Sequence, residues 1–223
     1  MNSPTSKHEL YYRKQEDRNM IYCQNRCVIT LLLLLVATTG KSSLVAGQQL
    51  PSAFNGRDMA GWQVPENNIW WGVTEGVLTA TSDPQKTGSI LWTEQEFTNF
   101  VFECEFKFGE GTVDSGVFLR TSKEQIQIGI SGSLKRDMTA SPYIDGKGYP
   151  VEAEGIQNLL KLEDWNTLTI VAMGNNYTVW LNHKYVMNYK SETAVVKGPV
   201  GLQLHPNNEM SVHFRNIRIA ELE

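Results

Sequence analysis

The chain has 223 residues, a formal net charge of −4 and 41% hydrophobic residues, which is the balance of an ordinary globular protein. There is no excess of one charge sign, and no stretch concentrates Lys and Arg among aromatic residues, so the sequence argues against nucleic acid as a partner. The three cysteines are too few for a disulfide framework.

The first 47 residues have the pattern of a secretory signal peptide. Basic residues between Arg13 and Arg26 precede the apolar run CVITLLLLLVA, and small residues follow it. The run spans about 11 residues, well short of the roughly 20 that a transmembrane helix needs. We therefore expect residues 1–47 to be removed and the product to be secreted or periplasmic, without a stable membrane anchor. A membrane anchor with a long cytoplasmic tail is the alternative.

Residues 48–223 are sufficient for one filled hydrophobic core and no second domain. Their single cysteine, Cys104, cannot form an internal disulfide, and no Cys/His spacing fits a structural zinc site. Cys104 lies on the apolar side of a strand pattern, so we expect a buried thiol.

Short alternating segments follow one another along this region. The clearest is 99–108, where Phe102, Cys104 and Phe106 fall on one side and charged residues on the other. Further strands are expected at 70–73, 76–80, 89–93, 115–120, 124–130, 165–173, 177–182, 184–189, 200–205 and 211–219. Only 154–164 offers a short helical stretch. Many strands with almost no helix predict an antiparallel sandwich or barrel, with Leu119, Leu204 and Phe214 also in the core.

The last expected strand contains a change of phase. Val212 and Phe214 share one face, whereas Ile217 and Ile219 belong to the other. A β-bulge near 215–216 would bring all four side chains into the core.

Residues 129–153 interrupt the alternation with a segment dense in glycine, charge and tyrosine. Long irregular segments inside compact domains are uncommon and are usually functional or disordered. We therefore expect a functional loop rather than a strand here, with an ordinary charged surface loop as the alternative.

Eight short motifs in this order resemble the 3-keto-disaccharide hydrolase domain family over residues 52–223. They are FNGRDMAGW, WGVTEGVL, FTNFVFECEFK, DSGVFLR, DWNTLTI, VWLN, GPVGLQLH and FRNIRI. The resemblance implies a concanavalin A-like antiparallel β-sandwich (a jelly roll) with one concave sheet open to sugar. It also implies cleavage of glycosides whose sugar carries a ketone at carbon 3, so an oligosaccharide or glycoside is the expected partner.

The chain departs from this family at three places. Asp114 stands where the family commonly has Asn, and Gln125 stands where it commonly has Glu. His183 replaces the Gly expected after Asn182 in a hairpin whose type I′ turn favours positive φ at both residues. The loss of a carboxylate at Gln125 keeps a non-catalytic carbohydrate-binding domain open as the alternative function. A structural or adhesive exported domain is a third class.

Alternation within the expected strands predicts which side chains face the sugar. The polar set on the face opposite the aliphatic residues is Arg120, Gln125, Gln127, Gln203 and His205. From the irregular segment, Tyr143 and Tyr149 could stack on a sugar ring, while Lys135, Arg136 and Asp137 could reach its hydroxyls. The alternative for the whole set is a solvated outer face.

The chemistry that the resemblance implies is an elimination. A base removes the hydrogen at carbon 2, which the neighbouring ketone acidifies, and the enolate then expels the group at carbon 1. His205 is the expected base because an imidazole titrates in the right range. Arg120 and Lys135 are the expected enolate stabilisers, with Asp137 as a substitute base or leaving-group acid. A divalent ion could replace the cations, although the sequence shows no ligand signature for one.

Overall fold

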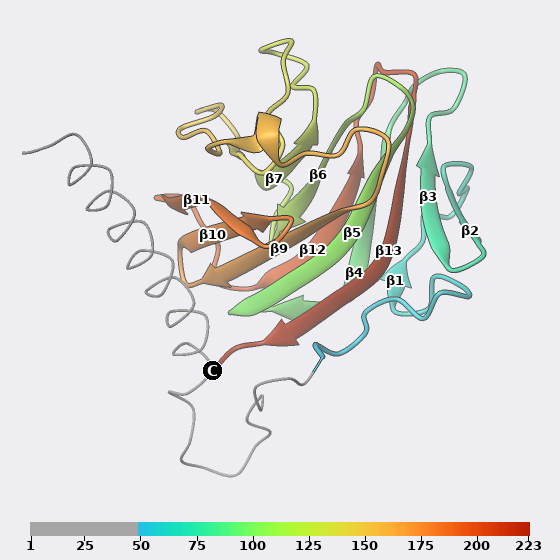
Figure 1. Ribbon diagram of the computed structural model, residues 1–223. Helices are drawn as coiled ribbons and strands as arrows, with labels where there is room; N and C mark the ends of the chain where they lie inside the picture. Colours follow the sequence, from blue (N-terminus) through green and yellow to red (C-terminus); the bar gives the residue numbers. More distant parts are fainter. Residues whose placement is uncertain (1–48) are drawn as a thin grey trace, which may run out of the picture. The chain divides into compact units, whose positions relative to one another are not determined.

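The computed structural model describes residues 49–223, and the predicted signal peptide at 1–47 lies outside the described residues. Within 49–223 the chain forms two antiparallel sheets that pack face to face (Figure 1). The prediction of an all-β antiparallel sandwich is confirmed. No helix in this described part is long and apolar enough to cross a membrane.

The six-stranded sheet carries the candidate site. Its spatial order is β1 (Trp62–Gln63), β4 (Ser89–Phe97), β12 (Gly198–Leu204), β6 (Asp114–Leu119), β7 (Glu124–Gly129) and β8 (Pro142–Ile144). Every neighbouring pair is antiparallel.

The seven-stranded sheet closes the other side of the core. Its order is β11 (Lys184–Lys190), β10 (Asn176–Leu181), β9 (Asn166–Met173), β5 (Phe100–Gly111), β13 (Met210–Glu221), β3 (Val77–Thr81) and β2 (Trp71–Thr74). The stretch expected to be helical contains one turn of 3₁₀ helix, η1 (Ile156–Asn158).

The core lies between the sheets and follows the period-two patterns of the sequence. The six residues predicted to be core are all buried: Phe102, Cys104, Phe106, Leu119, Leu204 and Phe214. Burial raises the pKa of the Cys104 thiol far above its ordinary value, so the thiol stays protonated and unreactive.

The predicted bulge in β13 is present. The register of β13 against β5 shifts between Arg215 and Arg218, and Asn216 adopts φ +52°. The shift turns Ile217 into the core, where it is fully buried, on the same side as Phe214.

Residues 129–153 are more regular than the sequence predicts. Pro142–Ile144 form β8, which pairs with β7 at the edge of the six-stranded sheet. Ile130 and Asp137 also form an isolated bridge, and Met138 and Ala140 are buried. In Figure 1 the yellow and orange loops between β7 and β9 gather at one end of the sandwich beside β7. The segment therefore adds a strand to the six-stranded sheet and covers its β7 edge.

Candidate active site on the six-stranded sheet

A line of residues crosses the outer face of the six-stranded sheet. The strand register pairs neighbours in the order Tyr143, Gln125, Phe118, Gly201 and Trp92. Directly paired residues of an antiparallel sheet share a face, so these side chains lie along one row over five strands. The rings of Trp92 and Phe118 stack with centroids 5.5 Å apart.

Two glycines leave space for this row to lie flat on the sheet. A Cβ at Gly201 would come within 2.6 Å of the Trp92 ring, and a Cβ at Gly116 within 2.8 Å of Gln125 Oε1. The indole and the amide therefore rest on bare backbone, and a larger residue at either position would displace them.

Asp114 organises the polar part of the face. Its Oδ1 accepts a hydrogen bond from Gln127 Nε2 at 2.8 Å, and its Oδ2 accepts one from the Gly132 backbone N–H at 2.9 Å. Gln127 Oε1 in turn accepts from Gln125 Nε2 at 3.0 Å. A carboxylate can only accept, so this chain fixes both amides with their oxygens turned away from Asp114.

The chain of amides ends in a free acceptor. Gln125 Oε1 is buried and has no hydrogen-bond partner within the described residues, and the same holds for Gln203 Oε1. The two residues are only 5% and 8% exposed. Buried polar atoms are normally satisfied, so two orphaned oxygens on one face suggest that a ligand's hydroxyls complete them.

His205 lies at the end of β12, beside Asp114. Its Nδ1 is 2.7 Å from the Pro206 carbonyl oxygen and 3.9 Å from Asp114 Oδ2. A carbonyl can only accept, so Nδ1 carries the proton, and Nε2 holds the free lone pair of the neutral ring. Nε2 of this partly exposed imidazole is thus available to accept a proton.

Tyr143 and Tyr149 form the wall on the β8 side. Their ring centroids are 5.2 Å apart in an edge-to-face arrangement. Burial, with the added repulsion of the Asp114 and Tyr143 charges, raises the pKa of Tyr149 to about 12 despite a hydrogen bond with Ser131. The Tyr149 hydroxyl therefore remains a hydrogen-bond donor at neutral pH.

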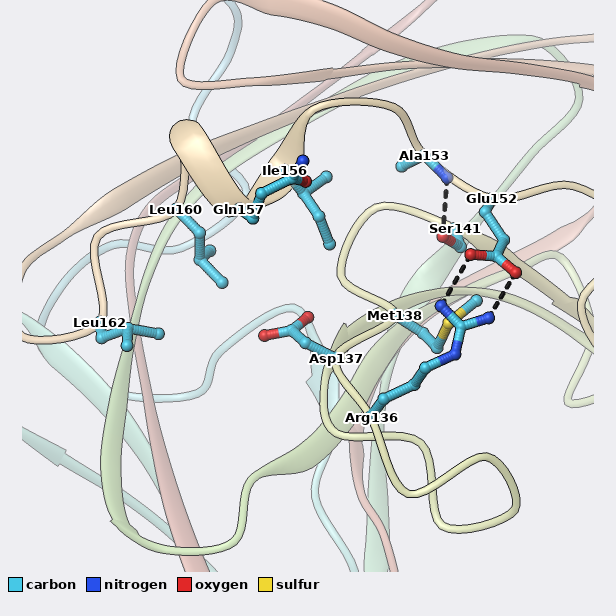
Figure 2. Close-up of a pocket in the computed structure, with 10 residues that line it drawn as sticks. All are labelled: Arg136, Asp137, Met138, Ser141, Glu152, Ala153, Ile156, Gln157, Leu160 and Leu162. Carbon is cyan, nitrogen blue, oxygen red and sulfur yellow. Dashed lines mark hydrogen bonds and ion pairs between the residues drawn. The ribbon is translucent and has the colours of Figure 1, made fainter.

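Arg136 and Asp137 of the segment 129–153 lie away from Asp114 and His205. Arg136 forms an exposed bidentate ion pair with Glu152, and Asp137 accepts from the Thr139 N–H at 2.8 Å. Figure 2 shows Arg136 and Asp137 lining a pocket whose opposite wall includes Leu160. Neither His205 nor Asp114 lines this pocket. Lys135 is an exposed residue of the nearby turn, in which its N–H bonds to the Ser131 carbonyl.

Arg120 does not join the face on which alternation placed it. β6 ends at Leu119, and Arg120 adopts φ +65°, which breaks the alternation. Its Nη1 donates to the carbonyls of Gly174 and Val195, and its guanidinium lies over the Phe100 ring. The side chain is 3% exposed and is directed between the sheets, so the structure does not bring it together with His205.

Asp114 is a site residue that the sequence marks only as a departure from a family motif. It has the same strand parity as Gly116 and Phe118. Extending the alternation back by two residues places it on the polar face with Gln127, and this is the signal that could have found it.

The described residues 49–223 contain no group of three or more His, Cys, Asp and Glu side chains that could hold a metal ion. Asp114 and His205 alone are a poor ligand set for the divalent ion considered above.

The chain is similar to known proteins over most of its length. The family model of the 3-keto-alpha-glucoside-1,2-lyase-like domain matches residues 50–220. A candidate glycosyl hydrolase from Parabacteroides distasonis is 23% identical, with a TM-score of 0.59 over 78% of this chain and 100% of the other. The carbohydrate-binding module CBM66 from Bacillus subtilis is 15% identical, with a TM-score of 0.50 over 72% and 96%. No curated protein matches significantly in sequence.

Proposed function

The chain belongs to the 3-keto-alpha-glucoside-1,2-lyase-like domain family, and on this premise we propose that it is an exported enzyme that cleaves 3-keto-glycosides. The main support is the geometry of the His205 imidazole. Its Nδ1 bonds to the Pro206 carbonyl and faces Asp114, so Nε2 is free to take a proton. An oriented base beside a carboxylate is what an elimination at carbon 2 requires.

The proposed reaction begins with proton transfer from carbon 2 to His205 Nε2. The electrons of that C–H bond form the enolate with the carbon 3 ketone. They then form the double bond between carbons 1 and 2 as the bond from carbon 1 to the leaving group breaks. Proton return from the imidazolium completes the leaving alcohol, and water adds across the double bond in a later step, so that the sum is hydrolysis. Asp114, at 3.9 Å from Nδ1, stabilises the imidazolium between these transfers.

The neighbouring groups supply binding and charge stabilisation. The Tyr149 hydroxyl, protonated at neutral pH, is the donor we propose for the enolate oxygen. Lys135, on the turn beside Gly132, is a second candidate for that role. Gln125 Oε1 and Gln203 Oε1 would accept hydrogen bonds from sugar hydroxyls. Arg120 and Asp137 have no place in this arrangement because their side chains are directed elsewhere.

A non-catalytic carbohydrate-binding domain is the second candidate. Gln125 presents an uncharged amide oxygen where relatives commonly have a carboxylate, which suits binding of hydroxyls as well as catalysis. In that case the same face would bind a sugar without changing it.

Release of the leaving group from a 3-keto-glucoside and from the matching plain glucoside separates these functions. We expect release from the keto substrate alone, with a slower rate when deuterium replaces hydrogen at carbon 2. His205→Ala should lower turnover by about a hundredfold or more. His183→Ala, an exposed hairpin histidine, is the matched control and should retain full turnover. Binding without release would favour the carbohydrate-binding domain.

A further inference from the structure

A groove distinct from the pocket of Figure 2 adjoins the candidate site along β12. It has a volume of about 500 Å³, and its wall includes Trp70, Ile90, Trp92, Gln203 and Pro206. We propose that this groove is the leaving-group subsite and that it binds an aromatic aglycone. The inference rests on the proposed function, since it names the substrate class of the same site.

The groove is continuous with the sugar-binding face through Gln203. Gln203 pairs with Ile90 across β12 and β4, and it precedes His205 by two residues on the same face. Gln203, whose Oε1 has no partner, therefore lies between the groove and His205. A sugar held at Asp114 and His205 would direct its carbon 1 substituent along β12 toward Trp92.

The chemistry of the wall favours an uncharged leaving group. None of the ten residues that line the groove is ionisable. A charged group placed here would be desolvated without a counter-charge among these residues.

The polar side chains of the wall are largely engaged with other protein groups. Trp70 Nε1 and Thr87 Oγ1 both donate to Asp83 Oδ1, at 3.0 and 2.9 Å. Ser89 Oγ accepts from Trp71 Nε1 at 2.9 Å. A sugar ring in the groove would bring several hydroxyls into a wall with few free partners, and each unmatched hydroxyl is costly. An aromatic ring carries no hydroxyls and needs no hydrogen-bond partners in the wall.

The aromatic wall is also preformed. Trp92 rests on the backbone of Gly201 and stacks with Phe118, and Asp83 holds the Trp70 indole. A flat ring can therefore stack on side chains that lose little freedom when it binds.

The test compares two substrates with the same keto-sugar, using the full chain. Benzyl and methyl 3-keto-α-glucosides both release simple alkyl alcohols, so the difference between them reports the groove rather than the leaving group's acidity. We expect kcat/KM for the benzyl substrate to exceed that for the methyl substrate by about tenfold, as ring stacking allows. A 3-keto-disaccharide should be used less well than the benzyl glucoside.

Variants assign the preference to the groove. Trp92→Ala should reduce the benzyl-to-methyl ratio toward one. Trp92 packs on the sheet, so its loss could impair folding. Ile90→Asn is therefore a second variant, which keeps the Trp92 indole and makes the groove more polar. It should also lower the benzyl-to-methyl ratio. Trp180→Ala, on the seven-stranded sheet, is the matched control and should leave the ratio unchanged.

The outcomes separate this inference from the proposed function. Turnover of both substrates at equal kcat/KM, or a preference for the disaccharide, would overturn the subsite while the proposed function stands. Absence of turnover on every keto-glucoside would overturn the proposed function. Calorimetric binding of the same two glucosides then decides the groove: tighter benzyl binding that needs Trp92 supports it, and equal binding rejects it.

Discussion

Asp114 determines the direction of every hydrogen bond in the chain that it begins. Its carboxylate accepts from Gln127, which accepts from Gln125, so Gln125 must present its oxygen to the site. The glutamate that the family resemblance implies at this position would place a carboxylate oxygen beside Gln127 Oε1, where the Gln125 Nε2 donor now lies. The departure at Gln125 is therefore matched to its neighbours.

Gln125→Glu tests this matching. The substitution removes the Nε2 donor that bonds to Gln127 Oε1 and buries a carboxylate beside that oxygen. We therefore expect the unfolding free energy to fall by about 1–3 kcal/mol at neutral pH, with no gain in turnover. Urea unfolding measures the loss, which should shrink at pH 5 as the buried carboxylate takes up a proton. A more stable or a faster variant would contradict the proposed role of the amide chain.

His213 gives a pH-dependent stability away from the site. Burial, and then the ammonium of its cross-strand partner Lys107, lower the pKa of His213 below 6.5. The unfolded chain therefore binds the proton first as pH falls, and stability decreases from about pH 6.5 down to the lower pKa of the folded state. The denaturation midpoint should depend less on pH across this window in His213→Gln, whereas His183→Gln should leave the pH dependence unchanged. An unchanged slope in His213→Gln would exclude this role.

The loop between β3 and β4 supports the segment that orients His205. Gly88 lies at φ +74°, and a Cβ there would be 2.7 Å from Pro206 N and 2.8 Å from Leu204 O. The Lys86 carbonyl of this loop also accepts a hydrogen bond from the Asn207 N–H. The position of the Pro206 carbonyl, and with it the imidazole, thus depends on this close approach.

Gly88→Ala should therefore affect both stability and turnover. The control is Gly146→Ala, since Gly146 has the same φ of +74° but a Cβ added there would meet nothing within 4 Å. Both variants carry the backbone penalty of about 1 kcal/mol, and only Gly88→Ala adds the clash. Thermal unfolding and kcat on a 3-keto-glucoside should both fall further for Gly88→Ala. Equal behaviour of the two variants would show that the contact with Pro206 is unimportant.

Elements defined by local alternation could be predicted from the sequence, and those defined by neighbours could not. Phe102, Cys104 and Phe106 follow period two, and the phase change before Ile217 required a bulge. β8 is three residues long and exists because β7 offers it an open edge, which no local pattern records.

The same distinction applies to the candidate site. Gln125, Gln127 and Gln203 are predicted to share a face because their strands continue past them, and the structure places them together. Arg120 lies one residue beyond the end of β6, where positive φ redirects its side chain. The hydrogen bond from His205 to Pro206 and the groove beside Trp92 depend on distant loops, so the sequence alone could not predict them.

A buried charged cluster joins the two sheets at one end of the core. Glu124 on β7 is 1% exposed and accepts hydrogen bonds from Tyr177 on β10 and from Ser191 and Thr193. Arg120 reaches the same region and lies over the Tyr177 ring. Burial, strengthened by the bond to Glu124, raises the pKa of the Tyr177 hydroxyl, which stays a donor. This end of the sandwich is therefore held by charge and hydrogen bonds.

Removing one charge from this cluster should cost far more than removing a surface charge. Arg120→Met would remove the positive charge that attracts Glu124 and leave the Gly174 and Val195 carbonyls without their donor. We therefore expect a loss of about 3 kcal/mol in unfolding free energy by urea titration. Adding Glu124→Gln to that variant should recover part of the loss, because the double variant buries no uncompensated charge. The control is Lys197→Met, whose exposed ion pair with Glu96 spans 3.6 Å and is worth at most about 1 kcal/mol. If Arg120→Met and Lys197→Met cost the same, the buried cluster does not hold the sheets together, and apolar packing alone accounts for this end of the sandwich.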